Sequence, residues 1–74
     1  MKVIDFNKTV YELWKEDENI ALILAELGFK DIAKAGMINT AGRFMTIPKG
    51  ARIKGFNLDE IREGFKNRGY EVKE

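Results

Sequence analysis

Residues 36–55 read GMINTAGRFMTIPKGARIKG, and this stretch decides how the rest of the chain can fold. It contains four of the seven glycines, the only proline, two of the three methionines and no acidic residue. Because glycine and proline interrupt helices and form turns, the stretch predicts short elements joined by tight connections. Longer helical patterns lie on either side of it. We therefore expect any binding function to reside here.

The clearest helix lies before this stretch and is predicted to form the core. Its apolar residues recur at helical spacing and cover much of its circumference: Ile20, Ala21, Leu22, Ile23, Leu24, Ala25 and Leu27. Asp17 is expected to cap its start, and Gly28 is the usual residue for the left-handed position after a helix. The segment that follows is expected to form one or two further turns, with Phe29 and Ile32 facing inward.

Capping patterns mark two more helices. Thr9 and Glu12 have the spacing of a capping box, in which each side chain binds the other residue's backbone amide. Asn57 and Glu60 repeat this spacing with asparagine as the cap. The apolar periodicity after each cap predicts a short helix after Thr9 and a last helix that ends at Gly69.

Within residues 36–55, the first helix is expected to be short. Gly36 is predicted to interrupt the chain. Asn39 or Thr40 then caps a helix that runs through Met45, with Phe44 and Met45 buried.

A second helix is expected in the latter half of the stretch. Thr46 is a good cap, Pro48 is tolerated in a first turn, and Gly55 is expected to end the helix. Gly50 weakens its interior by roughly 1 kcal/mol relative to alanine, and such a glycine often marks the close approach of another backbone or a ligand. Three residues are expected to pack inward, namely Ile47, Ala51 and Ile53.

These patterns predict an all-α fold, a compact orthogonal bundle of four to five short helices forming a single domain over residues 1–74. Residues 3–6 and 70–74 have an extended character, which allows a minor two-stranded pairing of the termini. At 74 residues the chain is near the lower limit for independent folding, so its net stability is expected to be small.

The composition excludes several classes of function. The sequence contains no cysteine and no histidine, which removes disulfides, thiolate or imidazole metal sites and the commonest general base. We expect no enzyme activity, no metal and no cofactor. The longest apolar run, Ile20–Ala25, is far too short for a membrane span, and no signal-peptide core is present, so a cytoplasmic location is expected.

The net charge is +1, but it is unevenly distributed. Residues 32–58 contain five basic and no acidic residues, whereas residues 1–31 contain four basic and seven acidic ones. A net charge this small argues against nucleic acid as a partner, since binding would be weak and salt-sensitive. The basic centre suits a small anion better, although simple variation in a short chain explains it equally well.

The order of these elements resembles the DUF1858 family. The resemblance is carried by TVYEL (9–13), ILAELGF (23–29), the central MINTAGRFMTIPKGA (37–51) and KGFNLDE (54–60), and it covers almost the whole chain. It implies an all-helical fold and, from relatives fused to PAS and hemerythrin-like modules, a sensing or accessory role. Many relatives carry paired cysteines directly after the position of Gly28 and Phe29. This chain has residues 30–33, KDIA, there, so a redox role is not carried over.

The candidate ligand site combines helix starts, glycines and two cations. Free backbone amides at helix starts attract anions, and guanidinium and ammonium groups add charge. The residues are Asn39, Thr40, Gly42, Arg43, Thr46, Lys49 and Gly50. The alternative is structural: the polar residues cap helices, the glycines form turns and the cations are solvated. No phosphate-binding glycine motif is present.

A second set offers an adaptable apolar surface, consisting of Met37, Phe44 and Met45. In a domain of this size such residues are also typical of the core. The first functional hypothesis is therefore a non-catalytic sensing or accessory module that binds a small anionic or amphipathic molecule. The alternative is a protein–protein interaction or homodimerisation module.

Overall fold

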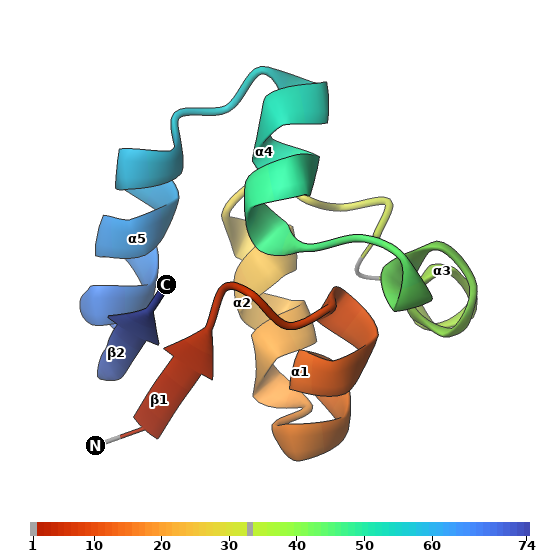
Figure 1. Ribbon diagram of the computed structural model, residues 1–74, viewed down its shortest axis with the longest axis horizontal. Helices are drawn as coiled ribbons and strands as arrows, with labels where there is room; N and C mark the ends of the chain where they lie inside the picture. The colour runs from red at the N-terminus through yellow and green to blue at the C-terminus, as the bar shows by residue number, and fades with distance from the viewer. Residues whose placement is uncertain (1, 33) are drawn as a thin grey trace.

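The computed structural model describes residues 2–32 and 34–74 of the chain. Its α-helices are short, and the two chain ends pair at one side (Figure 1). The elements are β1 (Lys2–Asp5), α1 (Val10–Glu16), α2 (Asn19–Glu26), α3 (Ala35–Asn39), the 3₁₀ turn η1 (Ala41–Arg43), α4 (Ile47–Lys54), α5 (Leu58–Lys66) and β2 (Tyr70–Lys73). This confirms a helical bundle with a minor pairing of the termini.

The predicted core helix forms α2, with one correction. Its inner face is buried, but Leu22 is 66% exposed, so the prediction that Leu22 widens the buried stripe is wrong. Neighbouring elements cover only one side of α2, and Leu22 points from the other. The N-cap of α2 is Glu18 and not Asp17 as predicted, but Asp17, one residue earlier, still accepts the Asn19 amide at its Oδ1 at 3.0 Å. Gly28 has φ +112° after the helix and allows the chain to turn there.

The capping patterns form largely as predicted. Both halves of the capping box at Thr9 and Glu12 are present at the start of α1. At the start of α5 the Asn57 side chain accepts the amide of Asp59 at 2.8 Å, one residue before the expected partner Glu60. In both cases a side-chain oxygen satisfies a backbone donor that a helix start leaves without a partner.

The first half of the central stretch differs from the prediction. Gly36 lies inside α3, which begins before it, and so does not interrupt the chain. Thr40 forms no cap; its hydroxyl instead donates to the Gly36 carbonyl at 2.9 Å. Because the helix begins earlier than expected, the inward position falls on Ile38, which is 1% exposed, and Phe44 is 78% exposed. The predicted burial of Phe44 is therefore wrong.

The second half of the stretch forms α4 as predicted, capped by Thr46 and ended by Gly55 at φ +74°. Ile47 and Ala51 are buried, whereas Ile53 is 67% exposed, so its expected packing is wrong. The turn expected after Gly28 is irregular, with Phe29 buried and Ile32 partly buried. The prediction for that turn extends over residue 33, which lies outside the described residues.

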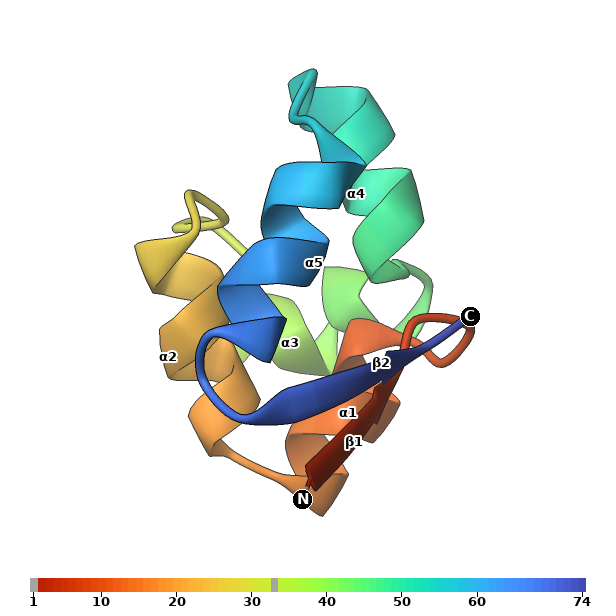
Figure 2. The same ribbon diagram turned by 90° about the vertical axis from the view of Figure 1, so that its left-hand side faces the viewer.

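The chain ends form a parallel ribbon that closes the fold. β1 and β2 pair in the register Lys2 to Tyr70 through Asp5 to Lys73, and Figure 2 shows β2 crossing beside β1 at the foot of α5. Edge-on contacts between aromatic rings hold this ribbon against α5, with ring centroids 6.0 Å apart for Phe6 and Phe65 and 5.6 Å apart for Phe65 and Tyr70.

A long-range hydrogen bond joins the ribbon to the corner between α1 and α2. The Tyr70 hydroxyl donates to Asp17 Oδ2 at 2.5 Å, and Lys2 Nζ lies 3.5 Å from the same oxygen. Burial, together with this bond, raises the pKa of Tyr70 to about 12. The hydroxyl of Tyr70 and the amide of Asn19 lower the pKa of Asp17. The bond is therefore strongest where tyrosine is neutral and aspartate is charged.

We predict that Tyr70→Phe lowers the free energy of unfolding by about 1 kcal/mol at neutral pH, because the Asp17 carboxylate loses a donor. The folded pKa of Tyr70 is raised, so its contribution is complete below its ordinary value of 10.0 and is lost as pH rises towards about 12. Urea unfolding over this range should show the difference between the two proteins shrinking. Tyr11→Phe is the control, and a pH-independent difference would contradict the prediction.

Candidate functional site

A backbone hydrogen bond places the start of α4 beside the start of α1. The Val10 amide donates to the Met45 carbonyl at 2.8 Å, and Thr9 pairs with Thr46 in an isolated antiparallel bridge. Val10 is the first residue of α1, so its amide has no partner within that helix. The bond satisfies this donor and sets α4 next to α1, with a space between α4 and the turn that follows α2.

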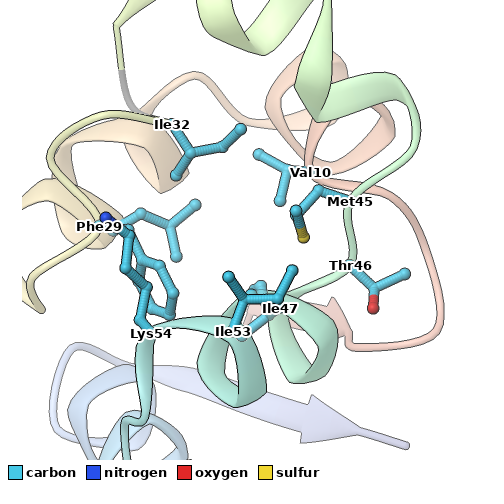
Figure 3. Close-up of a pocket in the computed structure, with 10 residues that line it drawn as sticks. Val10, Phe29, Ile32, Met45, Thr46, Ile47, Ile53 and Lys54 are labelled. Atoms are coloured by element: carbon cyan, nitrogen blue, oxygen red, sulfur yellow. The ribbon is translucent and has the colours of Figure 1, made fainter.

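That space is an apolar cavity of about 60 Å³. Side chains from α1, α2, the turn after α2 and α4 converge on it (Figure 3). The lining residues are Val10, Leu24, Phe29, Ile32, Met45, Thr46, Ile47, Gly50, Ile53 and Lys54. Because Ile53 and Lys54 are exposed, the cavity opens to solvent at the end of α4.

Polar groups lie only at the edge of this cavity. The Thr46 side chain points away from its centre in Figure 3, and its Oγ1 accepts the Lys49 amide at 3.3 Å. The Lys54 ammonium lies 3.3 Å from Asp31 Oδ2, on the turn that also carries Phe29 and Ile32. The walls therefore suit an apolar group, and the rim offers a single cation.

Gly50 forms the floor of the cavity on α4. A β-carbon there would lie 3.3 Å from Phe29 Cε1 and 3.7 Å from Met45 Cγ and Sδ. The sequence predicts close approach of another backbone or a ligand at Gly50, and the structure corrects this, because the neighbours are side chains. Glycine lets Phe29 and Met45 reach the helix backbone, and the space left beside them is part of the cavity.

The candidate ligand residues fall into two groups. Thr46 and Gly50 line the cavity, whereas the other five do not: Asn39, Thr40, Gly42, Arg43 and Lys49. The loop and helix starts on which the anion-site prediction rested do not enclose one common hollow. The half at residues 46–50 reaches the cavity, and the half at residues 39–43 lies on α3 and η1.

Arg43 is held by its neighbours on the surface. Its Nε donates to the Asn39 carbonyl at 2.7 Å, and its guanidinium lies over the Tyr11 ring at 4.2 Å from the centroid. Gly42 is buried under α1, where a β-carbon would meet the Tyr11 amide nitrogen and the Met37 carbonyl oxygen, each at 3.6 Å. These contacts give both residues a structural role.

The three candidate interface residues also lie in different environments. Met45 is half-buried and lines the cavity, whereas Met37 and Phe44 are exposed, by 40% and 78%. Sequence reasoning did not single out Lys54 as a site residue. The only signal for it was its place at the predicted end of a helix in the basic centre.

The acidic residues form no metal site in the described part of the chain: no three of them are grouped to hold a metal ion. Within residues 2–32 and 34–74 no helix is both long and apolar enough to cross a bilayer.

Comparison with known proteins identifies the family. The model of DUF1858, described as a domain of unknown function, matches residues 4–61. This chain belongs to the DUF1858 family. No curated protein matches it.

A solved structure extends this result to the whole fold. The chain is similar to a conserved domain protein from Streptococcus pneumoniae TIGR4, with 35% identity and a TM-score of 0.90. The similarity covers 97% of this chain and 91% of that one. The terminal ribbon of this DUF1858 domain thus lies within the aligned fold, although the family match ends at residue 61.

Two glycine substitutions test the packing at the cavity floor. Gly36→Ala adds a methyl group to α3 in open space and should raise the free energy of unfolding by up to about 1 kcal/mol. Gly50→Ala gains the same helix propensity but must displace Phe29 by a few tenths of an ångström, so the gain should be smaller. Chemical denaturation measures both. An equal or larger gain at Gly50 would show that Phe29 does not contact the floor.

Proposed function

We propose that this DUF1858 domain is a non-catalytic binding module for a small amphipathic molecule, acting as a sensing or accessory unit. The observation that carries the proposal is the apolar cavity between α4 and the turn after α2, with one cation at its rim. The family description names no function, so the proposal depends on this site alone.

The size of the cavity limits the ligand. An apolar cavity of about 150 Å³ holds one benzene, so at about 25 Å³ for each carbon a cavity of 60 Å³ encloses about two to three carbons. The end of a short hydrocarbon chain has this volume. Burial in apolar walls favours such a chain by about 0.8 kcal/mol for each methylene. The opening beside Ile53 and Lys54 leaves the polar end of the ligand in water.

We propose binding rather than catalysis because few of the side chains that line the cavity are polar. The polar side chains are the Thr46 hydroxyl, which caps α4, and the Lys54 ammonium, which pairs with Asp31. Neither has a general base beside it in the cavity. We also propose a cytoplasmic location, in keeping with a sequence that has no cysteine.

We predict that 1-pentanol binds in this cavity with a Kd on the order of 1 mM, since a ligand of this size gains about 4 kcal/mol. A titration of the full chain followed by amide chemical shifts should move Phe29, Ile32 and Gly50. Gly50→Leu should abolish these shifts by occupying the space, and Gly36→Leu on open α3 is the control. If Gly50→Leu fails to fold, Gly50→Ala should weaken binding. Absence of shifts at the cavity would refute the proposal.

A second candidate function is self-association, and the exposed side chain of Phe44 favours it. An isolated aromatic ring that is 78% exposed gains free energy when a partner covers it, and a small domain gains stability from association. Met37, on the neighbouring α3, is also exposed. Neither residue lines the cavity, so the two functions are separable.

If this second function holds, the wild-type chain should show a sedimentation coefficient that rises with concentration, and Phe44→Ser should remain monomeric. Leu22→Ser removes another exposed apolar side chain, on α2, and should leave association unchanged. A wild-type chain that stays monomeric at millimolar concentration would exclude self-association.

A further inference from the structure

Lys54 spans the mouth of the cavity. It is the last residue of α4, and its ammonium reaches Asp31 on the opposite wall, with 3.3 Å between Nζ and Oδ2. Asp31 directly precedes Ile32, which lines that wall. Figure 3 shows the Lys54 side chain extending from α4 towards the turn that carries Phe29 and Ile32.

This ion pair is easy to exchange. The side chains of Lys54 and Asp31 are 43% and 69% exposed, and exposed pairs contribute at most about 1 kcal/mol. Within residues 2–32 and 34–74, no second hydrogen bond or ion pair fixes the Asp31 carboxylate in its position beside Lys54. A second carboxylate at the mouth would therefore compete on nearly equal terms.

The other cations of the basic centre are not available to a molecule in the cavity. Arg43 lies over Tyr11, and Lys34, Lys49 and Arg52 do not line the cavity. Among the described residues that line it, none besides Lys54 is charged, so a second charge on the ligand would be buried without a partner, which is costly. A ligand with one anionic end and one apolar end matches this arrangement.

We propose that the ligand class is a short-chain monocarboxylate, with its hydrocarbon chain in the cavity and its carboxylate on Lys54 in place of Asp31. This inference rests on the proposed function and adds the identity of the polar end. The last two to three carbons of the chain fill the available volume, and the carbons nearer the carboxylate lie at the mouth beside Ile53 and Lys54. Dicarboxylates and alkylammonium ions of the same length should be rejected.

The test compares pentanoate, 1-pentanol and pentylammonium, which share a chain and differ in charge. Amide shifts of the full chain at low salt should give a Kd for pentanoate about threefold to tenfold lower than that for 1-pentanol. Pentylammonium should bind more weakly than either. Added salt should reduce the preference for pentanoate, because the contact is near the surface.

Three variants assign the preference to the ion pair. Lys54→Met should remove the preference, so that pentanoate and 1-pentanol bind with the same Kd. Arg52→Met removes a nearby cation that does not line the cavity, and it should keep the preference. Asp31→Asn removes the competing carboxylate and should tighten pentanoate binding by about twofold to fivefold.

The outcomes separate this inference from the proposed function. Equal binding of pentanoate and 1-pentanol by the wild-type chain would overturn the carboxylate assignment and leave the cavity as a binding site. A preference for pentanoate that survives Lys54→Met would also overturn it. Failure of all three compounds to bind would overturn the proposed function and this inference together.

Discussion

The arrangement of this domain depends on the hydrogen bond from the Val10 amide to the Met45 carbonyl. A helix start exposes backbone amides that must find acceptors, and here the chain itself supplies one from a distant segment. The bond brings two capped helix starts, at Thr9 and Thr46, into one antiparallel bridge. The position of α4, and hence the cavity between α4 and the turn after α2, follows from this contact. Residues 40–46 are held against α1 by this bond together with the packing of Gly42 under α1 and of Arg43 over the Tyr11 ring.

The other end of the molecule is held differently, by the closing of the termini. Residues 2–5 and 70–73 pair as a parallel ribbon, and three aromatic rings pack edge to face beside it. Tyr70 also reaches the Asp17 carboxylate at the α1–α2 corner. A bidentate ion pair between Arg62 and Glu74 holds the last residue against α5 and raises the pKa of the guanidinium. In a domain with a core this small, contacts between residues far apart in sequence contribute a large share of the stability.

The features that the sequence predicts well are those with a local cause. The capping box at Thr9, the cap at Thr46 and the glycine after α4 all act within one helical turn, so their chemistry can be recognised from neighbouring residues. The apolar spacing of α2 is equally direct. Pairing of the termini was predicted only as a minor feature, because four-residue strands carry little periodicity.

The features that the sequence does not predict depend on which face of an element its neighbours cover. Phe44, Ile53 and Leu22 are residue types typical of a core, yet each side chain is mostly exposed in the described structure. Gly36 disfavours a helix locally but is accommodated near the start of α3. The site shows the same limit: Thr46 and Gly50 line the cavity because α4 packs there, whereas Lys54 is a site residue because Asp31, on the turn after α2, lies opposite it. Such contacts are set by tertiary packing.

The parallel pairing of β1 and β2 has a mechanical consequence. The first residue of β1 faces the first residue of β2, so the N-terminus leaves one end of the ribbon and the C-terminus leaves the other. A pull applied between the two ends of the chain therefore loads the hydrogen bonds of the ribbon in shear, all at the same time, rather than opening them one after another. Within a longer polypeptide under tension, this ribbon would carry the load before any helix does.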